Sequence, residues 1–252
     1  MSARGIRSRS RLWRALAAIA VLAPSVFLGV RWHERQLGAE LMATPPARAA
    51  QDPRLAKYAA ARAQQAAKTH CAGCHGAALT GDGEKGAPDL IDAEWLLGDG
   101  SVPEIERIIR AGIRSGRPGA FAPEPMPAYA GRLSPAEIED LMAFLYSLRG
   151  IPSQAAAVQR GRALYRAEGS CVACHGPDGE GDAAKGVPNL ADKVWLYGAS
   201  APDAIRKSIA AGRRGVCPGF GDTVDAVTVR ALALYLNAET LRARAEAARA
   251  GM

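Results

Sequence analysis

The chain has 252 residues, of which 48% are hydrophobic and 23% charged, and its formal net charge is +7. The basic excess does not indicate a nucleic-acid partner, because residues 1–35 alone hold seven arginines against one glutamate. The tail from Ala238 adds three arginines and two glutamates, which leaves residues 36–237 neutral overall. The basic excess therefore belongs to the two ends of the chain and gives no indication of a basic binding face on residues 36–237.

The first predicted element is the apolar segment Leu12–Val30, which contains one charged residue, Arg14. As a helix rising about 1.5 Å per residue it would span roughly 28 Å, close to the bilayer core. The arginines on its N-terminal side favour a cytoplasmic N-terminus, with the rest of the chain in the periplasm. A cleaved signal peptide is the alternative, although the possible cleavage site Ala47-Arg48-Ala49 lies far beyond the apolar run. We expect residues 1–35 to be a single-pass inner-membrane anchor and residues 36–52 to be a linker.

A five-residue motif, CxxCH, occurs twice, at residues 71–75 and 171–175. Two cysteines at this spacing can form thioethers with the vinyl groups of a haem, while the adjacent histidine binds the iron. The motif therefore predicts two covalently bound haem c groups. The attaching residues would be Cys71, Cys74, Cys171 and Cys174, with His75 and His175 as iron ligands. A redox dithiol, or one zinc site shared by both motifs, is the alternative.

The similarity between the two halves extends beyond the motif, which neither alternative explains. Residues 85–90 match 185–190, and residues 95–98 match 195–198, in the same register. The register breaks through an insertion at 117–125 and resumes where Met126-Pro127 corresponds to Cys217-Pro218. A repeat of about a hundred residues indicates a duplicated domain. We place the two domains at 53–150 and 151–237, followed by a helical tail at 238–252.

The predicted secondary structure is helical. Alanine-rich helices precede the two motifs, at about 53–68 and 153–168. A capping oxygen, an early proline and an acid mark further helix starts at 101–104, 134–137 and 200–203. Apolar residues at helical spacing continue the second of these to about Leu148, and a less regular run at 224–236 predicts its equivalent. No pair of alternating segments indicates strands.

The order helix, CxxCH, loops, helix, Met-Pro, helix resembles the class I cytochrome c fold. Residues 53–237 resemble, more narrowly, the periplasmic domains of CcoP, the di-haem subunit III of bacterial cbb3-type cytochrome c oxidases. The matching motifs are CHGPDGEG at 174–181, WLYG at 195–198 and GRRGVCPGF at 212–220. The resemblance implies a mainly α protein with two tandem class I cytochrome c domains, and the apolar segment Leu12–Val30 adds an N-terminal transmembrane helix before them. It also implies electron transfer from soluble cytochromes to an oxidase core.

A class I haem iron needs a second axial ligand, usually a methionine in a proline-flanked loop. Met126 is expected to bind the first iron, with Met142, in an apolar helical stripe more typical of a core, as the alternative. The second half has no methionine before the last residue, and Cys217 stands at the corresponding position. We expect its thiolate to bind the second iron and to lower its potential below that of the first. A bystander thiol beside five-coordinate iron, with Lys193 or Lys207 as a remote substitute ligand, and an intermolecular disulfide are the alternatives.

Other residues are expected to support the haems. A proline carbonyl would accept the Nδ1–H of each proximal histidine, and a tryptophan would donate its indole N–H to a propionate or pack in the core. Arg213 would neutralise a propionate or be solvated. Gly161 and Tyr235 are expected to form a close helix crossing. The prolines and tryptophans concerned are Pro88, Trp95, Pro188 and Trp195.

The sequence predicts a membrane-anchored periplasmic di-haem cytochrome that relays single electrons in a respiratory chain. Expected partners are a soluble cytochrome c or another redox protein, the membrane and the subunits of an oxidase. An enzyme is the alternative: a haem bound by a histidine and a cysteine could oxidise a sulfur compound, as in thiosulfate dehydrogenases, or act as a peroxidase or sensor. The chain has no Ser/His/Asp arrangement, P-loop or Rossmann fingerprint, so we assign no catalytic residue.

Overall fold

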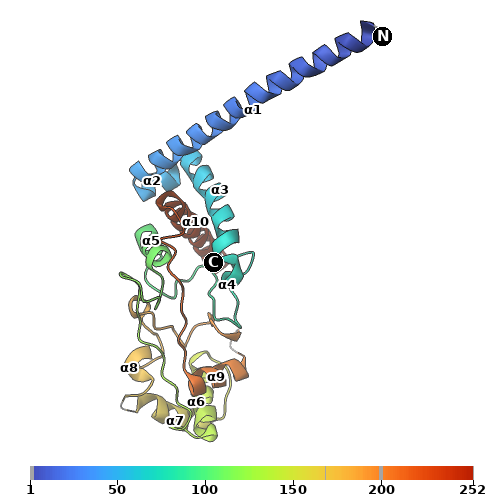
Figure 1. Ribbon diagram of the computed structural model, residues 1–252. Coiled ribbons are helices and arrows are strands. Elements are labelled where there is room, and N and C mark those ends of the chain that lie inside the picture. Colours follow the sequence, from blue (N-terminus) through green and yellow to red (C-terminus); the bar gives the residue numbers. More distant parts are fainter. Residues whose placement is uncertain (1–2, 168, 199–200, 252) are drawn as a thin grey trace.

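The computed structural model describes residues 3–167, 169–198 and 201–251, and of residues 3–22 only Trp13 has a described side chain. A long helix, α1 (Ala3–Ala43), projects from one end of an elongated helical body (Figure 1). No helix in the described part of the chain is both long enough and apolar enough to cross a membrane. Within the predicted anchor, Leu12–Val30, the side chains of residues 12 and 14–22 lie outside the described residues.

The predicted helices are present, and the described residues form only isolated β-bridges instead of strands. Each motif lies on a single helical turn that follows a longer helix, and each half then continues with two more helices. The helices of the first half are α2 (Pro46–Gln51), α3 (Pro53–His70), α4 (Ala72–His75), α5 (Val102–Ala111) and α6 (Pro135–Leu148). Those of the second half are α7 (Ala155–Arg166), α8 (Val172–His175), the 3-10 turn η1 (Ala183–Lys185), α9 (Pro202–Ala211) and α10 (Ala226–Ala250).

Side-chain caps fix where three of the long helices begin. Asp52 accepts hydrogen bonds from two backbone N–H groups at the start of α3, and Asp225 accepts one at the start of α10. Ser134 and Glu137 form a reciprocal capping box at the start of α6. Each cap stabilises its helix by about 1 kcal/mol. The capping oxygen predicted at Ser101 was wrong, because that side chain makes no cap hydrogen bond.

The first core combines helices from both halves of the sequence. Helix α10 packs along α3 and against α5, so the last helix of the chain lies beside the helix that precedes the first motif (Figure 1). Leu55 of α3, Ile105 of α5 and Leu232 of α10 are at most 2% exposed. Arg230 of α10 also forms an ion pair with Glu106 of α5. The first motif is therefore supported by a helix from the second half.

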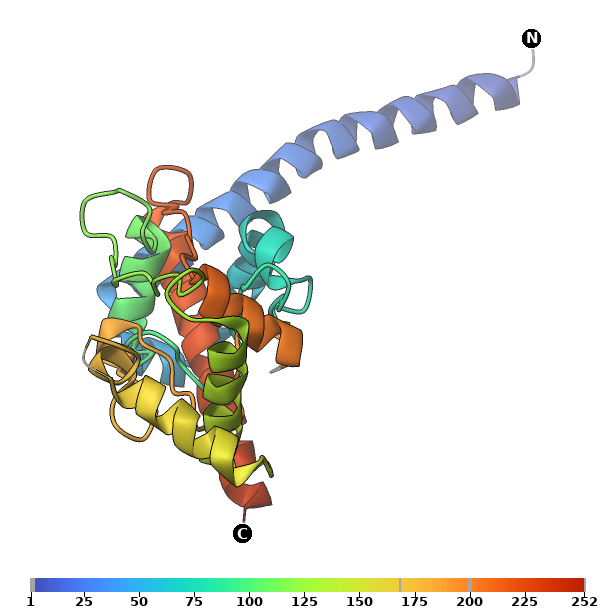
Figure 2. The same cartoon turned by 90° about the horizontal axis from the view of Figure 1, so that it is seen from below.

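The second core is built by α6, α7 and α9, and so takes its C-terminal helix from the first half. Phe144 of α6 packs against Tyr165 of α7, with ring centroids 5.0 Å apart. Arg160 donates two hydrogen bonds of 2.7 Å to Asp140 across the same contact. Figure 2 shows α7, in yellow, crossing α6, in green. The connection between these helices is short, which favours an antiparallel pair of neighbours.

Two extended segments, which we call the crossovers, carry the chain between the two cores. They are residues 112–134, after α5, and residues 212–225, after α9. Ile113 and Cys217 exchange two backbone hydrogen bonds of 2.9 and 3.0 Å, and Met126 and Arg213 exchange two of 3.0 and 3.1 Å. In the repeat, position 113 corresponds to 213 and position 126 to 217. The two pairs are therefore equivalent, and the exchange of helices has approximate two-fold symmetry.

The crossovers require glycine where they leave α5 and α9. Gly112 and Gly212 both have positive φ, and a Cβ on either would lie 2.4 Å from a carbonyl oxygen of the opposite crossover. For Gly112 this oxygen belongs to Cys217, and for Gly212 it belongs to Met126. A side chain at either position would push the two backbones apart.

Three sequence expectations change with this packing. Residues 36–52 are not an open linker, because they continue α1, form α2 and bury Leu41 and Ala49 completely in the first core. Position 238 is not a boundary, because α10 runs through it and Thr240 is 2% exposed. Gly161 does not meet Tyr235, which packs against the first core. A Cβ on Gly161 would instead lie 1.9 Å from the Asp140 carbonyl oxygen of α6, so the close crossing is α6 with α7.

The swap of C-terminal helices between the two halves predicts which motif each of these helices supports. Leu232→Ala in α10 should increase hydrogen–deuterium exchange in α3 and leave α7 near the wild-type rate, because the cavity opens in the first core. A buried Leu→Ala substitution costs about 2–5 kcal/mol. Leu145→Ala in α6 is the matched control and should loosen α7 instead. Faster exchange of α7 in Leu232→Ala would mean that each half keeps its own last helix.

Candidate haem sites

Each CxxCH motif forms one helical turn. The backbone N–H of His75 donates to the Cys71 carbonyl at 2.9 Å, and that of His175 donates to the Cys171 carbonyl at 2.8 Å. All four cysteines of the motifs are free thiols; the first of each pair is half-buried and the second is exposed. The turns therefore present two unpaired thiols and a histidine, which is the donor set for covalent haem attachment.

The two histidines are held by equivalent carbonyl groups. His75 Nδ1 lies 2.8 Å from the Pro88 carbonyl oxygen, and His175 Nδ1 lies 3.0 Å from that of Pro188. A carbonyl can only accept, so Nδ1 carries the proton and Nε2 keeps the lone pair that binds iron. Burial lowers the pKa of His175, although the hydrogen bond to Pro188 opposes this shift. Its ring therefore stays neutral near pH 7, as ligation requires.

Equivalent loops follow the two motifs. The N–H of Gly81 donates to the His75 carbonyl and that of Gly181 to the His175 carbonyl, both at 2.9 Å. Each loop is then closed by an ion pair, Lys85 with Asp82 at 3.0 Å and Lys185 with Asp182 at 2.8 Å. The same local structure has thus formed twice. No group of three or more His, Cys, Asp or Glu in the described ranges is arranged to hold a bare metal ion, so the motifs do not assemble the shared zinc site.

Cys217 lies beside the first motif, not beside the second as expected. The ring of Phe220, on the same crossover, meets that of His70 with centroids 5.9 Å apart, and His70 directly precedes Cys71. Burial, Cys217 and Cys74 raise the pKa of the Cys71 thiol to about 11. Burial and then Cys74 raise the pKa of Cys217. These mutual effects place the Cys217 thiol near both cysteines of the first motif.

Met126 lies on the side of the second motif. It packs against the second core, as Cys171 does. Burial raises the pKa of the Cys171 thiol, and the hydroxyl of Tyr129, three residues further on, lies close enough to this thiol to oppose the rise in part. Met142 is 2% exposed inside the same core. The expected pairing of Met126 with the first motif is therefore not found, because the crossover carries it to the other core.

Three groups expected near a propionate have protein partners in this structure. The Trp95 indole N–H donates to Thr240 Oγ1 at 3.2 Å, and that of Trp195 donates to the Asp192 carbonyl at 3.2 Å. The Arg213 guanidinium lies 3.6 Å from the centroid of the Tyr197 ring and donates to Ser208 Oγ at 2.9 Å. All three side chains therefore bind other groups of the protein.

Two residues near the motifs were missed at the sequence level. Tyr165 is fully buried, and its hydroxyl donates at 2.7 Å to the carbonyl of Gly176, next to His175; burial raises its pKa. The first half has Gln65 at this position, so the repeat gave no signal. Arg114 donates to the Pro123 carbonyl on its own crossover at 2.8 Å, and it joins the two crossovers by donating to the Gly215 carbonyl at 2.9 Å. Its positive φ of 50° is a further feature that the sequence does not show.

Comparison with known proteins gives matches over both halves. Residues 60–149 match the family described as cytochrome c, and residues 156–236 match cbb3-type cytochrome c oxidase subunit III. Subunit CcoP of the cbb3-type oxidase of Rhodobacter capsulatus is 35% identical over 208 residues, which cover 79% of this chain and 68% of the relative. Subunit FixP of Bradyrhizobium sp. (strain ORS 278) is 37% identical over 74% of this chain and 63% of its own length. Subunit FixP of Azorhizobium caulinodans is 36% identical over 74% of this chain and 61% of its own length.

Two haem-attachment turns, each in its own helical core, define a c-type cytochrome with two covalently bound haem c groups. The chain belongs to the subunit III family of cbb3-type cytochrome c oxidases, as the resemblance predicted. It spans 61–63% of the length of the two FixP relatives.

Removing the Tyr165 hydroxyl should destabilise the second core. Tyr165→Phe leaves the Gly176 carbonyl with only the 3.4 Å bond from the Gly179 N–H. Loss of the shorter bond costs about 1 kcal/mol and should lower the melting temperature by roughly 2–4 °C. Tyr146→Phe is the matched control, because the buried Tyr146 hydroxyl has no hydrogen-bond partner among the described residues. Thermal unfolding of the haem-loaded chain measures both. Equal shifts in the two variants would contradict a specific role for Tyr165.

Proposed function

We propose that this chain is the electron-transfer subunit of a cbb3-type oxidase and relays single electrons from a soluble cytochrome c, or another redox protein, to the oxidase. The observation that carries the proposal is the match to relatives named as subunits of such oxidases across both motifs and both cores. Haem c supplies one-electron exchange between ferric and ferrous iron. The neutral working part of the chain is suited to transient docking of a redox partner.

The chain's own residues hold the two sites in a fixed relation. His75 and His175 are oriented by carbonyl groups, and the two cores exclude water from one side of each motif. Four backbone hydrogen bonds pair the crossovers, and Arg114 adds one side-chain bond between them, to the Gly215 carbonyl. A rigid connection keeps the distance between the two irons constant, so transfer does not depend on a search by two loosely tethered domains.

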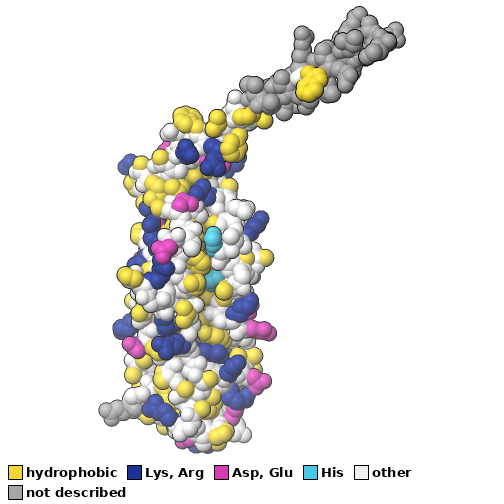
Figure 3. Space-filling view, in the orientation of Figure 1, with side chains coloured by type: hydrophobic (Ala, Val, Ile, Leu, Met, Phe, Trp, Pro, Cys, Tyr) yellow, Lys and Arg dark blue, Asp and Glu magenta, His cyan; other side chains and the backbone are white. Residues whose placement is uncertain are grey.

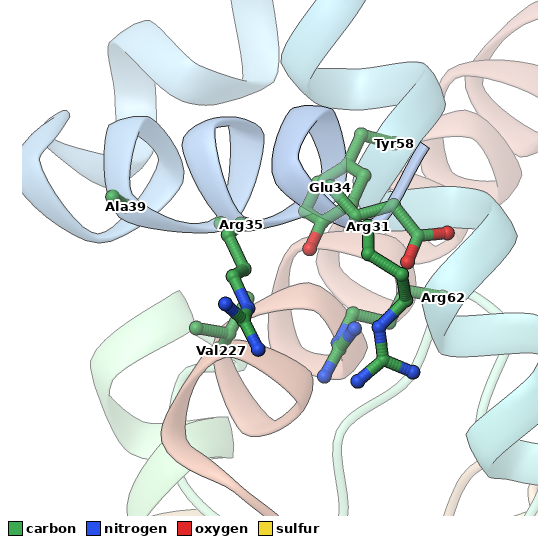
Figure 4. A pocket seen from close by; sticks show the side chains of 8 residues that line it. Arg31, Glu34, Arg35, Ala39, Tyr58, Arg62 and Val227 are labelled. Atoms are coloured by element: carbon green, nitrogen blue, oxygen red, sulfur yellow. The ribbon is translucent and has the colours of Figure 1, made fainter. Parts of the chain in front are cut away.

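We further propose that α1 anchors the chain in the inner membrane with both cores in the periplasm. The described side chains of α1 include five large apolar groups that are 52–66% exposed, a group that water disfavours. They are Val26, Phe27, Leu28, Val30 and Trp32. Figure 3 shows hydrophobic side chains where α1 joins the body. Arg31 and Arg35 line a hollow at the same junction (Figure 4), a position suited to the phosphate layer of a bilayer surface.

Replacing residues 1–35 by a cleavable signal peptide tests the anchor. The haem-stained protein should move from the membrane fraction to the soluble periplasmic fraction and keep both haems, because both cores lie beyond residue 35. The full chain should resist a high-salt wash, which removes proteins held by charge alone. Release of the full chain by salt would contradict an inserted helix.

The relay is tested in a host whose cbb3-type oxidase lacks its own subunit III. The full chain should copurify with the oxidase and restore oxygen consumption fed by a reduced soluble cytochrome c. Cys71→Ser/Cys74→Ser, which removes one haem, should still copurify but support at least tenfold slower consumption. Failure to copurify, together with reduction of the isolated chain by thiosulfate, would favour the sulfur-oxidising enzyme instead.

A further inference from the structure

We propose that the Cys217 thiolate, in place of the usual methionine, is the distal iron ligand of the haem attached at Cys71 and Cys74 and gives this haem the lower reduction potential. Met126 then serves the haem attached at Cys171 and Cys174, so that the ligands are crossed between the halves. The inference deepens the haem sites described above. It depends on the two attached haems and not on the identity of the oxidase partner. It reverses the assignment that the order of the sequence suggests.

The path of the second crossover carries the argument for Cys217. After Cys217 the chain runs against α5 of the first core: the N–H of Phe220 donates to the Ile109 carbonyl at 2.8 Å, and that of Gly221 donates to the Arg110 carbonyl at 3.0 Å. The Phe220 ring meets His70 beside the first motif. Cys217 is thus held in the loop that precedes the C-terminal helix of the first core, where a class I cytochrome carries its distal ligand.

The first crossover places Met126 in the equivalent position on the second core. The N–H of Tyr129 donates to the Ile209 carbonyl at 3.1 Å, and that of Ala130 donates to the Ala210 carbonyl at 2.9 Å. These bonds correspond, in the repeat, to those of Phe220 and Gly221 on α5. Tyr129 and Cys171 both pack in the second core. The same geometry therefore faces each candidate ligand toward the motif of the other half.

Cys217 is not an isolated cysteine on a surface. Its thiol is half-buried, and it lies close enough to Cys71 and Cys74 for a charge on one sulfur to act on the others. Cys71 and Cys74 attach a haem whether or not Cys217 is present. The group beside Cys217 is therefore that haem. A soft sulfur ligand at this place suits iron.

Crossed ligation reverses the order of the two reduction potentials. A thiolate stabilises ferric iron and lowers the potential, whereas the neutral thioether of Met126 favours ferrous iron. The first haem would then have the lower potential. One electron would pass downhill from the ferrous first haem to the ferric second haem, in the order of the sequence.

Single-haem variants of the full chain test the assignment. Cys171→Ser/Cys174→Ser keeps only the first haem, and Cys71→Ser/Cys74→Ser keeps only the second; mass spectrometry checks that one haem remains. In the oxidised first-haem protein, low-temperature EPR should show the narrow g spread of thiolate ligation. Cys217→Met should abolish that signal and raise the potential of this haem.

The second-haem protein decides the matter by itself if the first-haem variant does not fold. It should show a methionine-ligated low-spin signal that Cys217→Met leaves unchanged and that Met126→Ala converts to high spin. A thiolate signal in this protein would overturn the crossed assignment, as would a change on Cys217→Met. A first-haem protein without any thiolate signal would reduce Cys217 to a bystander and would also overturn it.

Discussion

The pairing of the two crossovers is the constraint on which the rest of the structure depends. Ile113 with Cys217 and Met126 with Arg213 hold two segments side by side that run in opposite directions between the cores. Once these segments are paired, α6 can only reach the second core and α10 only the first. Each core is then incomplete without the other half, and the apolar surfaces of α3 and α7 are both covered. The two haem sites therefore belong to one folding unit.

Local rules account for the helices and the motif turns. Caps at Ser134 and Asp225, helical spacing and the CxxCH pattern act within a few residues, so they can be read without knowing the fold. The partner of each C-terminal helix could not be read in this way, because the helical spacing of apolar residues in α6 and α10 does not say which core each helix joins. The choice depends on long-range contacts, such as Gly161 under the Asp140 carbonyl, where α3 has Ala61 instead.

Duplication has preserved the motifs but not their surroundings. In each half an equivalent proline carbonyl orients the histidine, and an equivalent lysine–aspartate ion pair closes the loop. Beyond these groups the halves differ: Trp95 is tied to Thr240 of α10, whereas Trp195 bonds within its own loop and lies under Arg149. Hydrogen bonds and charges around a haem tune its potential. Divergence in this outer layer lets one fold hold two haems with different roles.

The crossovers also connect the surroundings of the two irons directly. The backbone of Met126 is bonded to that of Arg213, and the backbone of Cys217 to that of Ile113. Each candidate ligand is therefore bonded to the crossover that carries the other one. Arg114 bridges the segments at a third place, through the Gly215 carbonyl. A shift of one loop on a change of iron charge must strain these bonds or move the other loop with it. The rigid pairing of the crossovers resists strain in these bonds and movement of the other loop. A haem site that moves little on reduction exchanges electrons with little reorganisation.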